Sequence, residues 1–245
     1  MGQDGGRAAP RQGGIALQGI GKAYGAAWAV RGVDLTLGPG ESLALFGPNG
    51  AGKTTLLKIL ATLITPTRGD GRVAGFDLRK EQEGIRESLA LLAHGTHLYE
   101  DLTVRENVEF AAAMRRRAGP LEALLERVGL AEAAGERVRA LSSGTKRRLA
   151  LAKVMLAEPT ILLLDEPFTN LDQAAVALLQ GFVAEVLARG GSVIMATHDL
   201  MRGYAACRRA AVLVNGRLIH EAPAQPGGLE ALRAAYVAAT GTQGG

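Results

Sequence analysis

The chain has 245 residues, of which 47% are apolar, and this suits one large domain with a substantial hydrophobic core. Its net charge is +4, but the basic residues are scattered apart from short runs at 115–117 and 146–148, so the composition argues against a nucleic-acid partner. The single cysteine, Cys207, excludes an intrachain disulfide and is interpreted as a small packed residue.

The N-terminal segment and the hydropathy of the chain bear on its location. Residues 1–13 are rich in glycine and contain arginine and proline, which predicts a flexible tail, and they lack the apolar run of a signal peptide. No apolar stretch approaches the ~18 residues of a membrane-spanning helix. We therefore expect residues 14–245 to form a single domain, and any membrane component to be another chain.

The first part of this domain is predicted to form strands separated by glycine-rich turns, at 15–20, 30–37, 42–46 and 72–76. The third strand leads directly into Gly47–Thr54, which has the spacing G-x-x-x-x-G-K-[ST], and leucines at helical spacing follow over 55–63. A strand, a glycine turn and a helix form the context that a phosphate-binding loop needs. A glycine turn that is followed by Lys-Thr by chance is the alternative.

Each part of this loop has an expected task at a nucleoside triphosphate. The glycines let the backbone wrap the phosphate chain, and the helix N-terminus adds partial positive charge. Lys53 is expected to contact the β- and γ-phosphates and Thr54 to bind Mg²⁺. The loop residues predicted to contact the nucleotide are Gly47, Pro48, Asn49, Gly50, Ala51, Gly52, Lys53, Thr54 and Thr55.

A helical segment is predicted next. Thr103 and Glu106 have the spacing of a capping box, which predicts a helix from Thr103 to about Arg117, and residues 120–138 also have a helical composition. Because strand-like runs vanish from about residue 85, we interpret residues 85–157 as a helical subdomain inserted in an otherwise α/β chain.

The end of this segment predicts a second helix N-terminus that can bind an anion. Ser142 or Ser143 is the expected N-cap, and Gly144 lies in the first turn of a helix that continues to Leu156. Bringing this N-terminus and the phosphate loop together on one nucleotide within a single short chain is difficult. We therefore expect the second site to serve the nucleotide of another copy.

Polar residues follow two further predicted strands, 160–164 and 192–197. Asp165 is expected to bind Mg²⁺, directly or through water, and Glu166 to polarise an attacking water; a helix-capping carboxylate is the alternative. His198 is expected at the same sheet edge, where an imidazole can donate to the γ-phosphate, with a surface histidine as the alternative.

The last predicted elements complete the fold class. A helix is predicted over 173–189, and strands at 211–214 and 217–219 flank Asn215-Gly216, a strong hairpin signal. Strands that alternate with helices predict an α/β fold with a mostly parallel core sheet and with nucleotide at the carboxyl edge of that sheet.

Taken together, the motifs resemble those of an ATP-binding-cassette (ABC) ATPase over about residues 14–222. The similar segments are Gly47–Thr54 (Walker A), 141–145 (signature), 161–166 (Walker B), 168–172 (D-loop) and His198 (switch histidine). The resemblance implies a P-loop NTPase fold with an antiparallel β subdomain and a helical insert. It also implies ATP and Mg²⁺ as ligands and ATP hydrolysis coupled to transport, with Lys53, Glu166 and His198 as catalytic residues.

The resemblance further implies an assembly. Such ATPases form head-to-tail dimers in which each ATP lies between Walker A of one subunit and the signature of the other. The residues expected on the partner's ATP are Ser142, Ser143, Gly144 and Asp172. The helical insert is expected to dock on integral-membrane transport subunits at the cytoplasmic face of the cell membrane. Tyr24 is similar to the aromatic that stacks on adenine, with Trp28 as the alternative and a core aromatic as the other interpretation.

The sequence departs from the family pattern in two places. A glutamine usually ends the strand that enters the helical insert, where it contacts Mg²⁺ and water, and here that position is His94 or Gly95. The signature has Thr145 where glutamine is common. Both changes bear on how hydrolysis is coupled to the membrane subunits.

Within the family, segments 59–67, 94–103 and 165–172 look most like the ATPase subunits of haem exporters used in cytochrome c maturation. This implies ATP-driven export of haem, or release of a haem carrier, through a separate membrane subunit. A general drug, lipid or ion exporter is the alternative, because the substrate is determined mainly by the membrane chain. A soluble ATPase that acts on ribosomes or in DNA repair is less favoured, because the chain has one cassette and a short insert.

Overall fold

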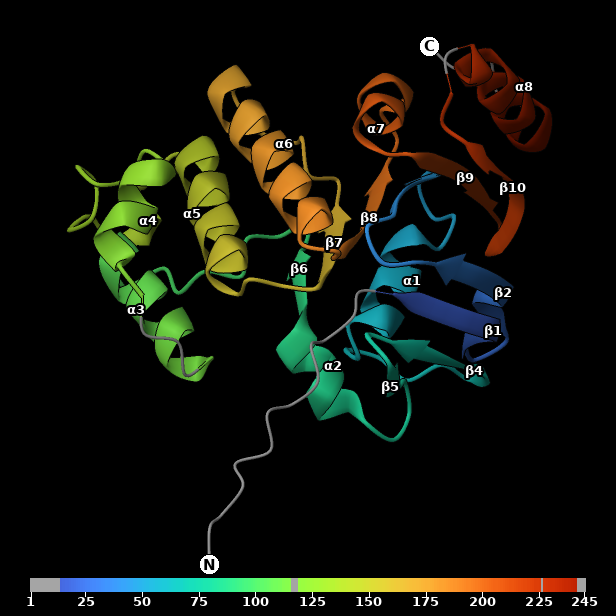
Figure 1. Ribbon diagram of the computed structural model, residues 1–245, viewed down its shortest axis with the longest axis horizontal. Helices are drawn as coiled ribbons and strands as arrows, with labels where there is room; N and C mark the ends of the chain where they lie inside the picture. Colours follow the sequence, from blue (N-terminus) through green and yellow to red (C-terminus); the bar gives the residue numbers. More distant parts are fainter. Residues whose placement is uncertain (1–13, 116–118, 226, 242–245) are drawn as a thin grey trace, which may run out of the picture.

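The computed structural model of the protein describes residues 14–115, 119–225 and 227–241, so the predicted tail at 1–13 lies outside the described residues. Two sheets organise the chain (Figure 1). One has four antiparallel strands in the order β2-β1-β4-β5, and the other has six strands in the order β10-β9-β3-β8-β7-β6. The first consists of β1 (Ile15–Tyr24), β2 (Ala27–Leu37), β4 (Arg68–Val73) and β5 (Phe76–Asp77).

The six-stranded sheet is the core of the α/β fold. Its strands are β3 (Ser42–Phe46), β6 (Leu89–Leu92), β7 (Ile161–Asp165), β8 (Ser192–Thr197), β9 (Arg209–Val214) and β10 (Arg217–Pro223). All neighbouring pairs are parallel except β9 and β10, which form the hairpin predicted at Asn215-Gly216. Every residue of β3, β7 and β8 is buried, as expected for parallel strands covered on both faces. The predicted α/β class, with a mostly parallel core sheet and an antiparallel β part, is confirmed.

Helices cover both faces of this sheet. The α-helices of the described residues are α1 (Lys53–Leu60), α2 (Gln82–Ser88), α3 (Val104–Met114), α4 (Leu121–Arg127), α5 (Ser143–Leu156), α6 (Gln173–Ala188), α7 (Leu200–Ala206) and α8 (Gly228–Thr240). In Figure 1, α3, α4 and α5 group together at one end of the molecule, and the antiparallel sheet lies at the other. Within the described residues, no helix combines the length and the apolar character that crossing a bilayer requires.

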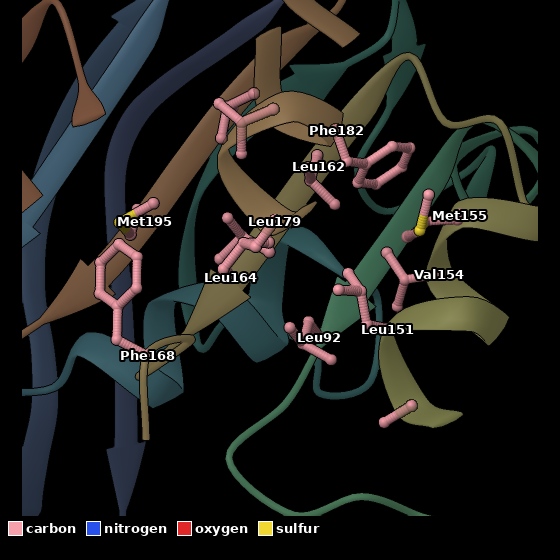
Figure 2. Packing of buried hydrophobic residues seen from close by; sticks show 14 of the residues in the cluster. Leu92, Leu151, Val154, Met155, Leu162, Leu164, Phe168, Leu179, Phe182 and Met195 are labelled. Carbon is pink, nitrogen blue, oxygen red and sulfur yellow. The ribbon is translucent and has the colours of Figure 1, made fainter. Parts of the chain in front are cut away.

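Alternation along the strands divides the core into two clusters. Leu162 and Leu164 of β7 belong to the cluster on the side of α5 and α6, whereas Ile161 and Leu163 belong to the cluster that contains the apolar residues of α1. Figure 2 shows Leu162 and Leu164 between side chains of α5 and α6. Cys207 is buried, and burial raises the pKa of its thiol to about 12, so its interpretation as a packed residue is confirmed.

Local differences from the predicted elements have local causes. The strand predicted at 72–76 is wrong: β4 ends at Val73, and Ala74 and Gly75, both with positive φ (52° and 84°), form a two-residue turn into β5. The continuous helix predicted over 120–138 is also wrong. There α4 ends at Arg127, and Gly129, with φ 69°, closes the helix terminus.

The helix predicted from Thr103 is confirmed together with its capping box, but it ends at Met114 rather than near Arg117, and residues 116–118 lie outside the described residues. Part of the range predicted as a helical subdomain is not helical. Within 85–157, Leu89–Leu92 forms β6, the edge strand of the core sheet, because it pairs with β7 and is mostly buried. The group of helices therefore follows β6.

Gly52, in the loop after β3, is constrained by space as well as by backbone conformation. A Cβ on Gly52 would lie 2.2 Å from the carbonyl oxygen of Ala29, whereas a Cβ on Gly50 would meet nothing within 4 Å. Both residues have positive φ, so an alanine would be strained at either position. Only at position 52 would its Cβ also force the Ala29 backbone to move.

We therefore expect Gly52→Ala to lower the free energy of unfolding by roughly 1–3 kcal/mol more than the matched control Gly50→Ala, measured by urea denaturation. Equal losses for the two variants would contradict the packing of this loop against β2.

Candidate active site

The loop that follows β3 forms one wall of a cavity of about 320 Å³ at the carboxyl edge of the core sheet. Residues 48–55 line the cavity, together with Ala29 of β2 and with His94, Asp165 and Glu166 from other segments. Gly47 contributes through its carbonyl, which accepts a hydrogen bond from Lys53. The structure thus brings the predicted phosphate loop and both predicted carboxylates together in a single cavity.

Lys53 is the buried cation of this cavity. Its side chain bends back over the loop, and Nζ donates to the carbonyls of Gly47 (2.6 Å) and Pro48 (3.2 Å). Burial lowers the pKa of this ammonium, while Glu166 and Asp165 act in the opposite direction. A positive charge with few water contacts is thereby held where a phosphate chain can reach it.

Thr54 and Asp165 place two oxygens side by side. The Thr54 hydroxyl donates to Oδ2 of Asp165 at 2.8 Å, and Asp165 is only 3% exposed. Burial raises the pKa of this carboxyl, against the hydrogen bond from Thr54, which lowers it. A desolvated carboxylate beside a hydroxyl is a donor set that suits a small hard cation such as Mg²⁺.

Glu166 is held in a conformation that non-glycine residues seldom adopt. Its φ is 46°, and its amide donates to the carbonyl of Ala196 at 2.8 Å. The hydroxyl of Thr197 donates to Oε2 of Glu166 (3.1 Å), and Nδ1 of His198 lies 2.9 Å from the same oxygen. The end of β8 therefore fixes the Glu166 carboxylate, and Glu166 and His198, each predicted as a catalytic residue, are in direct contact.

Two features of this region did not follow from the sequence reasoning. Thr197, the buried last residue of β8, was not assigned a role, although its position directly before His198 is the signal that could have indicated one. Arg147 was noted only as part of a basic run, yet it is buried, with 3% of its surface exposed. His198 lies beside Glu166 but outside the lining of the cavity.

The choice between His94 and Gly95 is resolved by position. His94, two residues after β6, lines the cavity with Asp165 and Glu166. Gly95 lines a different cavity. The side chain at the entry to the helical segment is thus a histidine, which can both donate and accept a hydrogen bond.

The predicted second anion site lies outside this cavity. Ser142, rather than Ser143, is the N-cap of α5, and its hydroxyl oxygen accepts from the amide of Thr145 at 3.1 Å. Gly144 lies in the first turn, as predicted. Asp172 caps α6 and pairs with Arg148 on α5 (2.6 Å); this ion pair lowers the pKa of the Asp172 carboxyl.

The aromatic candidates for adenine stacking also lie outside the cavity lining. Tyr24, at the end of β1, is 54% exposed, so it is not a core aromatic. Trp28 is partly buried, and the guanidinium of Arg68 lies 4.5 Å from the centre of its ring. Nζ of Lys22 lies 5.2 Å from the centre of the Tyr24 ring, so each ring has a nearby cation, but Tyr24 is the more exposed of the two.

Known proteins with similar sequences include ATP-binding proteins named for export or for drug resistance. The chain is 40% identical to cytochrome c biogenesis ATP-binding export protein CcmA 2 of Cupriavidus metallidurans, over 69% of this chain and 82% of that protein. It is 36% identical to daunorubicin resistance ATP-binding protein DrrA3 of Streptomyces coeruleorubidus, over 86% and 68% of the two chains. It is 35% identical to Nod factor export ATP-binding protein I of a Rhizobium species, over 84% of this chain and 70% of that protein.

Solved structures agree with these relatives. An ATP-binding subunit of an ABC transporter superposes with a TM-score of 0.84 at 27% identity, covering 92% of this chain and 99% of that chain. A dimeric ATP-binding cassette in a post-hydrolysis state, bound to ADP and Pi, superposes with a TM-score of 0.77 at 26% identity, over 86% and 99% of the two chains.

The sequence profile of the ABC transporter family matches residues 30–169, which contain the phosphate loop, the signature helix and both carboxylates of the cavity. The chain therefore belongs to the ABC transporter family, as an ATP-binding subunit whose hydrolysis of ATP is coupled to transport.

Proposed function

We propose that this chain binds Mg²⁺-ATP in the cavity beside the loop at 47–54, hydrolyses it as one half of a head-to-tail pair of cassettes, and powers haem export through a separate membrane subunit. The observation that carries the enzymatic part is the convergence of Lys53, the Thr54–Asp165 pair and the Glu166–His198 pair at one sheet edge. Each group in this set supplies a charge or an oxygen ligand that one part of the reaction needs.

The residues divide the work as follows. The backbone of residues 47–52 and the N-terminus of α1 surround the phosphates, and Lys53 supplies a full charge to the β- and γ-phosphates. Thr54 and Asp165 hold Mg²⁺, which neutralises phosphate charge when it is bound. Glu166 orients and polarises the attacking water, and Thr197 and His198 keep its carboxylate in place. Tyr24 offers an accessible ring to adenine.

Two substitutions separate binding from chemistry. Glu166→Gln preserves the shape of the side chain but removes its basic oxygen, so we expect ATP affinity within about twofold of the parent and hydrolysis slower by about 100-fold or more. Lys53→Ala removes the main cation of the cavity and is expected to abolish tight binding. Nucleotide titration and phosphate release measure the two effects. Hydrolysis by Glu166→Gln at the parent rate would refute the role of Glu166.

A second anion-binding site that lies outside this cavity supports the dimer. Ser142, Ser143 and Gly144 form a capped, exposed helix N-terminus outside the cavity of their own chain, together with Asp172 at the start of α6. Such a terminus binds anions, so we assign it to the γ-phosphate held by a second copy. A solved relative that superposes on this chain is described as dimeric in two structures.

Gly144→Asp tests this assignment. A Cβ on Gly144 would approach no atom closer than 3.5 Å, so the carboxylate fits in the monomer but would face the phosphate of the partner. We expect ATP-dependent dimerisation to be lost while the monomer still binds ATP, as measured by light scattering in the Glu166→Gln background. Gly135→Asp places the same charge in open space and is the control. An unchanged dimer in Gly144→Asp would exclude the head-to-tail arrangement.

A membrane partner is supported by apolar surface near α3. Leu63, Tyr99, Phe110 and Met114 are large apolar residues that remain exposed. Tyr99, Phe110 and Met114 line a cavity of about 280 Å³ together with residues of β6 and α5, and Leu63 lines a neighbouring cavity of about 440 Å³. Surface of this kind marks protein contacts more often than free solvent-facing surface. We propose that it receives the membrane subunit, which places this chain at the cytoplasmic face of the cell membrane as a peripheral subunit.

The cargo is the most specific part of the proposal. The relative from Cupriavidus metallidurans, named for cytochrome c biogenesis, supports haem or a haem carrier as the exported group. The daunorubicin and Nod factor relatives match a larger share of this chain, and they favour a general exporter as the second candidate.

Deleting the gene distinguishes the two candidates. If this chain drives haem delivery, covalently bound haem should disappear from c-type cytochromes while b-type haem proteins remain, as measured by haem staining of denaturing gels and by difference spectra. The parent gene should restore the signal, and the Glu166→Gln gene should not. Normal c-type cytochromes in the deletion strain would overturn the haem proposal and favour the general exporter, without affecting the assignment as an ATPase.

A further inference from the structure

Arg147, one turn into the signature helix α5, has an arrangement that no motif accounts for. It is 3% exposed, and its two terminal nitrogens reach two different chain segments. Nη1 donates to the carbonyls of Ala93 (2.5 Å) and His94 (3.4 Å), and Nη2 donates to those of Glu166 (3.1 Å) and Asp165 (3.4 Å). One planar group therefore links the segment after β6 to the end of β7.

This arrangement is costly as a means of stabilising the fold. The Nε of Arg147 is buried and has no hydrogen-bond partner among the described residues, and the hydrogen bonds of the guanidinium go to backbone carbonyls. Burial lowers the pKa of the group, with the Asp165 carboxylate acting in the opposite direction. Buried charges of this kind often stabilise a protein less than apolar side chains of the same volume do, so stability alone is a weak reason for an arginine here.

The four carbonyls belong to the reacting part of the molecule. Two of them flank the His94 position that lines the cavity, and the other two are those of the carboxylate residues Asp165 and Glu166. The Glu166 backbone has a φ of 46°, so an outside contact is needed to hold it. The fork of Arg147 thus joins the backbone at His94 to the backbone of both carboxylate residues.

The backbone of Arg147 belongs to helix α5, which packs against β6. Leu151, one turn further along α5, lies beside Leu92 of β6 in Figure 2, and both are buried in the same cluster. Ser142, which caps α5, begins the proposed contact with the partner's nucleotide. A small shift of α5 would therefore be transmitted through Arg147 to the residues around the water and the metal of its own chain.

We propose that Arg147 is a positioning residue that sets the distance of His94 from Asp165 and Glu166 and makes hydrolysis depend on the position of the signature helix. The proposal rests on the ATP hydrolysis of this family and is independent of the cargo. It requires the planar fork of arginine, because the ammonium of lysine is a point charge that cannot serve two segments with the same geometry.

The test separates the catalytic rate from binding. Arg147→Met keeps the volume of the side chain, and we expect ATP affinity within about twofold of the parent but kcat lower by about 10- to 100-fold, as for a small misplacement of reacting groups. ATP-dependent dimerisation, measured in the Glu166→Gln background, should persist. Arg127→Met is the matched control, because Arg127 joins α4 to α6 through Glu185 away from the cavity, and its kcat should match the parent.

A double-mutant cycle distinguishes positioning from a loss of fold stability. If Arg147 acts through the His94 segment, Arg147→Met should lower kcat much less in a His94→Ala background than in the parent. If Arg147→Met fails to fold, Arg147→Lys takes its place, with an expected kcat several-fold below the parent at unchanged ATP affinity and melting temperature.

Three results would overturn the proposal: a parental kcat in the folded Arg147 variant, a rise in KM alone, or an effect of the same size with and without His94. A lower melting temperature with a parental kcat would identify Arg147 as a structural residue only.

Discussion

The parallel pairing of β3, β8, β7 and β6 is the constraint on which the active site depends. Phe46 lies opposite Thr197, Asp165 opposite Ala196 and Leu92 opposite Leu164, so these four strands end within two residues of one another. Because parallel strands present their carboxyl ends at the same edge, the segments that follow them meet there although they are far apart in the sequence. This register brings together the phosphate loop, the carboxylates, the switch histidine and His94. A shift of one residue would also exchange the side chains that face the two core clusters.

Charge burial is the second consequence of this geometry. Lys53, Asp165 and Arg147 are each less than 10% exposed, and their hydrogen bonds are mainly to backbone carbonyls and a hydroxyl. Backbone dipoles hold a charge in place without neutralising it, so these groups can still interact strongly with phosphate and metal in a site of low dielectric. This favours a preorganised site, since little rearrangement of the protein is needed when charge develops on the nucleotide.

The arrangement also explains why one chain would contain two separate anion sites. The cavity holds the groups for binding and chemistry, whereas the capped N-terminus of α5 lies outside it. A nucleotide between two copies would connect these sites, and Arg147 would relate them within each chain by joining α5 to the backbone of Glu166. In this proposal, closure of the dimer and alignment of the water-activating carboxylate depend on the same helix. The apolar surface near Phe110 and Met114 lies on the helical segment that α5 supports, so a membrane subunit bound there could influence the same alignment.

Features that depend on neighbouring residues could be predicted from the sequence. The phosphate loop, the capping box at Thr103, the hairpin at Asn215-Gly216 and the carboxylates at the end of β7 are all encoded within a few residues, because turns, caps and helix starts depend on local conformation. The same holds for the α/β class, which follows from the order of buried strands and helices. The local predictions that were wrong, at 72–76 and 120–138, missed turns that Gly75 and Gly129 form.

The remaining features required the tertiary structure, because they connect residues that are distant in the sequence. A short apolar segment such as Leu89–Leu92 does not reveal whether it is strand or helix until β7 pairs with it. Neither the choice of His94 over Gly95 nor the contact of Thr197 with Glu166 can be derived from spacing, since each depends on which strands are neighbours. For Arg147, the sequence shows one basic residue in a run of three. Only the packing of α5 against β6 and β7 buries its side chain and directs it to four carbonyls.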